Sequence, residues 1–460
     1  MISRRDIDEE LQRRYIAPTR KERTEHVGVE FELPIVNLNK EPVDFEVIHR
    51  MVRAFTEEFS FTEFKFDDEG NICSALEPVT GDDLSFDCSY NTLEFSFGRE
   101  ENLRIIQERF RTYYRSISDF LREHGHAITG MGLNPYFRYN DIVPVPNGRY
   151  RMLLHHLKSY EKYADQMLFH KIPYYGLIAC SAQTHLDAAE EDLPDMINSF
   201  NRLEPLKALL FANSPFEDPE GTYLCVRDHL WRESMHGLNP HNVDGWQIEL
   251  ETTDEIIAYI RSMSLYCTER DGKYINFPPT PLEDYFSREE MTGEYFDGEG
   301  YRQISWQPQL QDLEYLRSFK FVDLTFRGTI ELRSACMQPV GEALTVPAFH
   351  LGLQERRREL KWLLRDAAIY KQGFNPVELR RLFVRRRWPA FADRQELTVL
   401  VQKLVELATD GLKGRGFGEE ILLEPLQSRA QRLESPALEM LRGIEAGRTV
   451  EDYIREYGTL

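Results

Sequence analysis

The chain has 460 residues, 42% of them hydrophobic, and a formal net charge of −21. This is enough for a large core, as one large domain or two to three smaller ones, and 28 Phe and 22 Tyr exclude a disordered chain. The acidic balance argues against nucleic acid or an anionic membrane surface as a partner.

The first third of the chain alternates polar and apolar residues over short stretches and shows helical periodicity over longer ones. These patterns predict a charged helix and loop at 1–24, a strand at 26–36, a helix at 44–59, short strands near 65–72 and 85–97, a helix at 101–124 that ends before Gly125, and a strand at 126–133.

The rest of the chain is interpreted in the same way. We expect a strand at 177–186, a helix at 193–211, a loop-rich segment at 214–250, a strand at 324–336, a long helix at 340–368 and only helices from Pro376 onward. The strands alternate in polarity instead of being continuously apolar, which favours an antiparallel over a parallel sheet. We expect a main domain at 1–375 and a C-terminal helical segment at 376–460 packed on it.

The six cysteines form no C-x-x-C pair and match no zinc spacing. Scattered thiols of this kind are typical of a reduced protein, so we expect a cytoplasmic location. The first ten residues have no apolar core of a signal peptide, and no run of 18 apolar residues predicts a membrane span.

Glutamates recur on one face of three predicted strands. Glu331 and Arg333 share a face, as do Glu30 and Glu32, and Glu94 adds a third strand. Acids facing inward from different strands repel one another unless cations lie between them. A single strand of this kind is ordinary in a solvated antiparallel sheet. Three of them predict a magnesium–nucleotide site inside a curved antiparallel sheet.

No glycine-rich phosphate loop is present. The chain contains no G-x-x-x-x-G-K-[ST] motif, and no G-x-G-x-x-G follows a predicted strand. If ATP binds, metal ions and arginines must therefore hold its phosphates.

The chain resembles the glutamate–cysteine ligase family, of the plant and bacterial carboxylate–amine ligase type. Similar segments follow in the family's order: Val-Gly-Val-Glu-Phe-Glu at 27–32, Leu-Glu-Phe-Ser at 93–96, Gly-Met-Gly-Leu-Asn-Pro at 130–135, Pro-Asn-Gly-Arg-Tyr at 146–150, Leu-Phe-Ala-Asn-Ser-Pro-Phe at 210–216, Arg-Asp-His-Leu-Trp at 227–231, Thr-Ile-Glu-Leu-Arg-Ser at 329–334 and the helical stretch at 408–417. Cys-Ser-Tyr-Asn-Thr at 88–92 departs from the Gly-Gly-Gln run of the plant branch. Segment 331–334 is nearer the enterobacterial form, which leaves the amine substrate open.

The resemblance implies an α+β fold with a curved, mainly antiparallel sheet that forms a funnel ringed by helices, similar to glutamine synthetase. It implies an enzyme, an ATP- and Mg²⁺-dependent ligase that forms γ-glutamylcysteine from glutamate and cysteine through a γ-glutamyl phosphate, as in glutathione biosynthesis. The expected partners are small-molecule substrates. Two alternatives stay open: the same fold with another acid or amine, and a non-catalytic regulatory member that binds nucleotide or amino acid. The sequence leaves the oligomeric state open.

The resemblance also implies a metal and phosphate site. Glu30, Glu32, Glu94 and Glu331 are its expected metal ligands. Arg333 is expected on the transferring phosphoryl group, next to Glu331 as the other catalytic residue. The alternatives are a plain strand acid for Glu94 and a salt bridge to Glu331 for Arg333.

The remaining expected site residues bind substrate or nucleotide. Arg227 offers a fork of donors for the α-carboxylate of glutamate, with Arg149 as a second choice and Trp231 lining the pocket. Gln183 and His185 share a strand face and are expected at the nucleotide or metal. A packing role is the alternative for Trp231 and His185.

Overall fold

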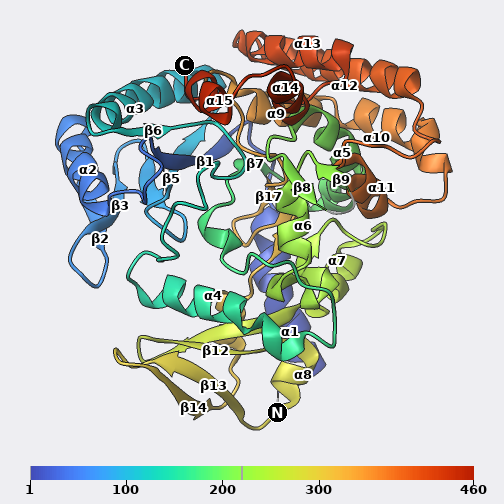
Figure 1. Cartoon of the computed structure of the whole chain (residues 1–460). Coiled ribbons are helices and arrows are strands. Elements are labelled where there is room, and N and C mark those ends of the chain that lie inside the picture. Colours follow the sequence, from blue (N-terminus) through green and yellow to red (C-terminus); the bar gives the residue numbers. More distant parts are fainter. Residues whose placement is uncertain (1, 219–220) are drawn as a thin grey trace.

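The main sheet of the molecule has nine strands, and the computed structural model describes residues 2–218 and 221–460. The strand order is β16-β17-β7-β1-β5-β4-β3-β2, with β6 paired to the end of β1, and neighbouring strands run antiparallel (Figure 1). The strands are β1 (Val27–Asn37), β2 (Glu63–Phe66), β3 (Ile72–Leu76), β4 (Asp83–Phe86), β5 (Thr92–Glu100), β6 (His126–Ile128), β7 (Ala182–Asp187), β16 (Val322–Leu324) and β17 (Thr329–Leu332).

One face of this sheet is apolar because the strands alternate in polarity. Phe31, Phe95 and Phe97 are buried on it, and the ring centroids of Phe31 and Phe110 lie 5.0 Å apart. Helix α2 (Phe45–Phe59) packs on β3, α3 (Leu103–Glu123) packs on β5 and β6, and α9 (Thr345–Glu355) packs on β1 and β7. Each buried Phe contributes about 1.5–3 kcal/mol, so this face forms the main core. The polar face is left for a site.

The other helices surround the sheet and its polar face. They are α1 (Arg4–Leu11), α4 (Gly148–Lys158), α5 (Leu193–Phe211), α6 (Val226–Arg232), α7 (Thr253–Arg261), α8 (Leu282–Ser287), α10 (Arg357–Asp366), α11 (Pro376–Phe383), α12 (Arg394–Arg415), α13 (Glu424–Arg432), α14 (Pro436–Glu445) and α15 (Val450–Tyr457). Helix α11 packs on α5, and α12 packs on α9. The segment 376–460 thus lies against the first part of the chain, and the proposed domain division stays a prediction.

A second sheet closes the bottom of the molecule in Figure 1. It joins β11 (Ser264–Arg270), β12 (Lys273–Pro281), β13 (Met291–Phe296) and β14 (Tyr301–Trp306), all antiparallel. Asp271 and Gly272 connect the first two strands with φ of 53° and 75°, as the turn of a tight hairpin requires. Helix α4 packs on β12. The sequence patterns predict no strand or helix in this stretch.

Short strand pairs and 3₁₀ or π turns complete the chain. They are β8 (Phe216–Asp218), β9 (Gly221–Tyr223), β10 (Val243–Asp244), β15 (Phe319–Lys320), the π turn Gln12–Ile16 and the 3₁₀ turns Ala17–Thr19, Ser159–Tyr163, Tyr175–Leu177, Glu190–Asp192, Met235–Leu238, Pro240–Asn242, Leu310–Tyr315, Val340–Glu342, Ala368–Lys371 and Glu419–Leu423. No helix within the described residues is both long and apolar enough to cross a membrane.

The predicted helices at 44–59, 101–124 and 193–211 are confirmed, as are the helices after Pro376. The predicted strand at 324–336 is a hairpin, because Gly328 turns the chain with φ of 77°. The long helix predicted at 340–368 is broken at Arg356, whose φ and ψ are −116° and 32°. The strand predicted at 85–97 is two strands, with Cys88 at φ 61° in the turn between them.

Candidate active site

The polar face of the main sheet lines a cavity of about 760 Å³. Glu32 lies directly opposite Glu94 on β5, and Glu94 lies opposite Ser85 on β4. On the other side, Glu30 lies opposite Gln183 on β7. The antiparallel register therefore gathers side chains from four strands around one space.

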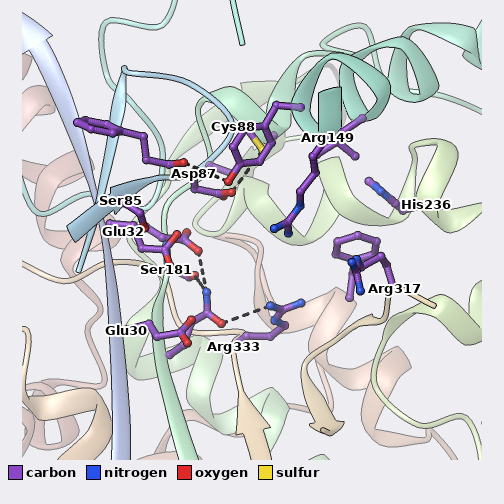
Figure 2. A pocket seen from close by; sticks show the side chains of 18 of the residues that line it. Glu30, Glu32, Ser85, Asp87, Cys88, Arg149, Ser181, His236, Arg317 and Arg333 are labelled. Atoms are coloured by element: carbon purple, nitrogen blue, oxygen red, sulfur yellow. Dashed lines mark hydrogen bonds between the residues drawn. The ribbon is translucent and has the colours of Figure 1, made fainter. Parts of the chain in front are cut away.

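The opposite wall of the cavity comes from a different part of the fold. Arg149 stands at the start of α4, Tyr266 and Cys267 come from β11, and Arg317 and Phe319 come from the segment before β16. Figure 2 shows Glu30, Glu32 and Asp87 on one side of the cavity, and Arg149, Arg317 and His236 on the other. The site is thus divided into an acidic wall on the sheet and a basic, aromatic wall facing it.

Local structure fixes Arg149 on one wall and Asp87 on the other. The Asn147 side chain caps α4 by accepting a hydrogen bond from the backbone N–H of Tyr150, which starts the helix at the cavity. Asp87 directly follows β4, in the turn that continues through Cys88, and the Cys88 thiol donates to its carboxylate at 3.4 Å. Sequence analysis missed Asp87, although it directly precedes the stretch at 88–92 that departs from the family pattern.

The acidic wall is under electrostatic strain. Burial, together with nearby Asp87, raises the pKa of Glu32 to about 7. Burial and the neighbouring Glu30 raise the pKa of Glu94 well above its ordinary value. Burial alone would raise the pKa of Glu30, but His185, Arg333 and Arg327 together outweigh it and lower the pKa to about 2. A cation placed among these groups would relieve their repulsion.

The donor set suits Mg²⁺. Among residues 2–218 and 221–460, no three His, Cys, Asp or Glu side chains form a ready-made metal site. Mg²⁺ is commonly held by only one or two carboxylates, with water and substrate phosphates completing its octahedron. The cross-strand pair Glu32 and Glu94 supplies two such carboxylates on one side of an open cavity.

Two of the predicted residues lie outside the cavity lining. Glu331 accepts from Arg333 at 2.7 Å between Nη2 and Oε1, as a salt-bridge role requires, and it does not line the cavity. His185 stands opposite Glu331 in the sheet and contacts Glu30 Oε1 through Nε2 at 3.1 Å. Both residues therefore reach the cavity through a neighbour, and their roles stay predictions.

Arg333 itself lines the cavity at the end of β17. Its Nη1 donates to the carbonyl of Ser318 at 3.0 Å, and its Nη2 donates to Oε1 of Gln183 at 3.4 Å. Gln183 in turn donates to Oε1 of Glu32 at 2.7 Å. This chain of contacts, drawn in Figure 2, aligns an arginine and a carboxylate side by side on the sheet.

Arg227 and Trp231 line the cavity from α6. The Nη1 of Arg227 donates to the carbonyls of Ser334 and Ala335, each at 3.3 Å, while its buried Nε has no hydrogen-bond partner among the described residues. Trp231 stacks on Phe319 with ring centroids 4.7 Å apart. Arg227 is therefore held rigidly at the cavity with donor capacity to spare.

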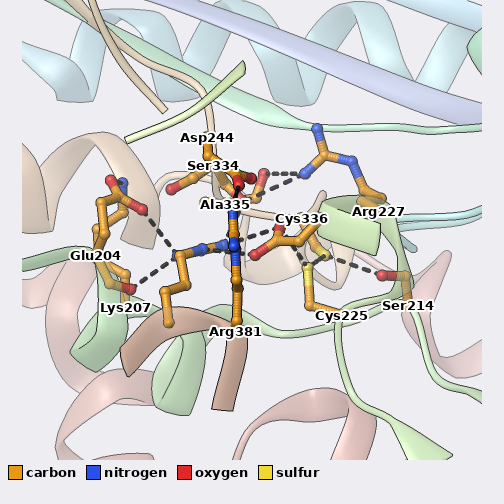
Figure 3. A network of polar contacts seen from close by, with 12 residues as sticks. Glu204, Lys207, Ser214, Cys225, Arg227, Asp244, Ser334, Ala335, Cys336 and Arg381 are labelled. Carbon is orange, nitrogen blue, oxygen red and sulfur yellow. Dashed lines mark hydrogen bonds and ion pairs between the residues drawn. The ribbon is translucent and has the colours of Figure 1, made fainter. Parts of the chain in front are cut away.

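A buried polar network supports α6 from behind (Figure 3). Arg380 of α11 donates to Asp228 at 2.6 Å and to Glu204 at 2.8 Å, and Lys207 contacts Glu204 at 2.8 Å. Arg380 also donates to the carbonyl of Ser334 at 3.3 Å. The network ties α11, α5 and the end of β17 to the helix that carries Arg227.

Comparison with known proteins gives the chain a family. The model of glutamate-cysteine ligase family 2 matches residues 26–456. The chloroplastic glutamate–cysteine ligases of Brassica juncea and Arabidopsis thaliana are each 24% identical to it over 458 residues, covering 94% of this chain and 79% and 78% of their own. The enzyme of Medicago truncatula is 24% identical over 434 residues, covering 91% of this chain and 77% of its own.

A solved structure supports the fold. The crystal structure of the glutamate–cysteine ligase of Francisella tularensis in complex with AMP aligns with a TM-score of 0.50 at 11% identity, covering 96% of this chain and 89% of that one. The predicted fold class, helices with a mainly antiparallel sheet, is confirmed, and the sheet stays open instead of closing into a barrel.

The expected cytoplasmic location is wrong on this comparison, because the plant relatives are chloroplastic proteins. Cysteine spacing distinguishes oxidising from reducing surroundings and cannot separate one reducing compartment from another. The predicted kinship is confirmed: with nearly its whole length matched by the family model, this chain belongs to glutamate-cysteine ligase family 2.

Proposed function

We propose that this protein is an ATP-dependent ligase that joins the γ-carboxyl group of glutamate to the amino group of cysteine. The observation that carries the proposal is the divided cavity, with carboxylates on one wall and arginines on the other, in a member of this family. Such a site would hold a metal–nucleotide against the sheet and leave space for two organic substrates.

The reaction would proceed in two steps. An oxygen of the γ-carboxylate attacks the terminal phosphorus of ATP, and ADP leaves. The amine nitrogen then attacks the carbonyl carbon of the acyl phosphate, loses a proton and expels phosphate. Phosphoryl transfer depends mostly on positioning and charge neutralisation, so few side chains need to react chemically.

Arg333 is suited to the transferring phosphoryl group. Its guanidinium is oriented by Glu331, Ser318 and Gln183, and Glu331 is the chief cause that raises its pKa, so it keeps its charge. Glu30, Glu32 and Glu94 would hold Mg²⁺, which neutralises phosphate charge when bound. Glu331 acts through Arg333, and His185 acts through Glu30.

The organic substrates would occupy the basic side of the cavity. Arg227 offers its remaining donors to the α-carboxylate of glutamate, and Arg149 is available for a carboxylate of either organic substrate. Trp231 would form part of the substrate wall, and Gln183, between Glu32 and Arg333, would contact the nucleotide phosphates. These assignments follow from position in the cavity and from spare hydrogen-bonding capacity.

A second candidate keeps the activation of glutamate and changes the amine. The stretch at 88–92 favours it, because it departs from the plant pattern and directly follows Asp87, a half-buried carboxylate that lines the cavity beside Cys88. The test is ADP release with ATP, Mg²⁺ and glutamate against a panel of amines, with product identified by mass spectrometry. γ-Glutamylcysteine as the main product supports the first proposal. Another γ-glutamyl amide with none from cysteine supports the second, and no amine-dependent ADP release contradicts both.

A further inference from the structure

Arg317 is a cavity residue that the sequence motifs did not predict. Its Nη1 donates to the backbone carbonyl of Glu314 at 2.9 Å. Within the part of the chain that the structure describes, no carboxylate lies within ion-pair distance of its guanidinium. Arg149 is in the same situation, with a cation–π contact to Tyr150, at 5.5 Å, and no carboxylate partner in that part of the chain.

Both guanidinium groups act on the same neighbours. Burial raises the pKa of the Cys267 thiol to about 12, and Arg317 and Arg149 are the two groups that oppose this. Burial raises the pKa of Tyr274 as well, and the same two arginines oppose that rise. Arg149 and Arg317 thus both act on the patch that Cys267 of β11 and Tyr274 of β12 form, and both line the same cavity. Figure 2 shows both across the cavity from Glu30 and Glu32.

Two guanidinium groups that form no ion pair and line the same wall repel each other, and an anion bound between them would stabilise both. The nucleotide phosphates are expected across the cavity, with the metal-binding carboxylates and Arg333. Arg227, on α6, has its own spare donors for glutamate. The anion left to place is a carboxylate on the second organic substrate, and a guanidinium fork matches a carboxylate in shape as well as charge.

The surroundings of this corner fit the rest of such a substrate. Phe319 follows Arg317 by two residues, stacks on Trp231 and lies 3.9 Å from His236 between ring centroids. Burial lowers the pKa of His236 well below its ordinary value, so this recess disfavours added positive charge. Aromatic surfaces accept a small sulfur-bearing or aliphatic group well.

We propose that Arg317, together with Arg149, binds the free carboxylate of the amine substrate, so that the enzyme selects an α-amino acid over a simple amine. This inference rests on the proposed ligase function and names Arg317 as a residue that determines its amine specificity.

The experiment compares cysteine with cysteamine, which has the same amine and thiol but no carboxylate. Arg317→Gln should lower kcat/KM for cysteine roughly 10- to 100-fold, the usual effect of losing a hydrogen bond to a charged group. The value for cysteamine should change less than about threefold, so that the preference for cysteine collapses. Arg317→Lys should recover part of the loss, because it restores the charge without the fork. Arg302→Gln, the same change on exposed β14, is the matched control.

Several outcomes would overturn the inference. An equal loss for cysteine and cysteamine would assign Arg317 to packing, and a raised KM for glutamate with unchanged amine preference would assign it to the acid substrate. If the wild-type protein makes γ-glutamylcysteine and Arg317→Gln keeps the wild-type preference for cysteine over cysteamine, the role of Arg317 is wrong and the proposed function stands. A wild-type protein that makes no γ-glutamylcysteine overturns the proposed function, and this inference with it.

Discussion

Glu32 is the most constrained carboxylate of the acidic wall. The backbone N–H of Ser181 donates to it at 2.6 Å, and Gln183 donates to it at 2.7 Å. These contacts fix its direction without neutralising it, and Glu94 faces it across the strand pair. A group held in this way is ready to bind a cation, whereas a flexible surface acid must first be ordered.

Glu32→Gln tests the metal role, because it keeps the shape of the side chain and removes its charge. We expect turnover to fall by about 10²-fold or more at ordinary Mg²⁺, as when one electrostatic contact to a transition state is lost. Turnover is measured across a Mg²⁺ titration, with Glu46→Gln, at an exposed position of α2, as the control. Wild-type turnover for Glu32→Gln at every Mg²⁺ concentration would contradict the metal assignment.

Arg333→Lys tests the phosphoryl role at the same scale. Lysine keeps the charge but loses the fork that now reaches Ser318, Gln183 and Glu331. We expect kcat to fall more than the KM for glutamate rises, because the interaction is made mainly in the transition state. Steady-state kinetics with glutamate varied decide this. An unchanged kcat with a raised KM would move Arg333 to substrate binding.

At the scale of elements, strands whose residues alternate between polar and apolar could be predicted from the sequence. The turns that connect short strands could not. Glu30, Glu32 and Glu94 alternate with buried apolar residues, so their shared face follows from the pleat. The hairpin at Gly328 was missed because its two strands have only three and four residues, too few to show a period of their own. Both were absorbed into one longer predicted strand.

Helices α9 and α12 approach each other so closely that their contact needs glycine. A Cβ added to Gly411 would lie 2.0 Å from the carbonyl oxygen of Gly352, and one added to Gly352 would lie 2.2 Å from that of Ala408. A methyl group there must push the helices apart. Because α9 packs on β1 and β7, the strain would reach the strands that carry the site.

Gly411→Ala should therefore destabilise the protein by about 1–3 kcal/mol, the usual cost of overpacking. Gly414→Ala is its matched control on the same helix, because the nearest heavy atom to its added Cβ is 3.9 Å away, at the flexible end of Arg356. The control should stabilise by about 0.5–1 kcal/mol through helix propensity. Urea unfolding of both variants measures the difference. Equal midpoints for the two would show that the helices separate without cost.

At the scale of the whole molecule, the site exists only because two sheets face each other. The motifs located the acidic wall and the α6 arginine, since those residues sit in recognisable segments. Arg317 and the β11–β12 wall stayed hidden because nothing local marks them. Their role depends on where the second sheet and α4 come to lie, and sequence periodicity carries no information about that placement.

The acidic wall should make the stability of the whole chain depend on pH. The pKa of Glu32 is raised from its ordinary 4.5 to about 7, and that of Glu94 is raised as well. The folded state therefore holds protons that the unfolded chain releases. The contribution of these two groups to the free energy of unfolding is lost as pH rises from about 4.5 through 7. Glu30, with a pKa lowered to about 2, contributes stability that is lost only on acidification below about 4.5.

Mg²⁺ competes with those protons, so it should raise Tm more at pH 8 than at pH 5.5. Other groups titrate in this range, such as Lys320, whose pKa is lowered to about 7 by burial. Their effect on Tm cancels when Tm is compared with and without Mg²⁺ at the same pH. Glu94→Gln should shrink the difference between the two pH values, because one of the repelling carboxylates is gone, whereas Glu63→Gln on exposed β2 should preserve it. A Mg²⁺ effect on Tm that is the same at both pH values, or that is unchanged in Glu94→Gln, would place the cation away from this wall.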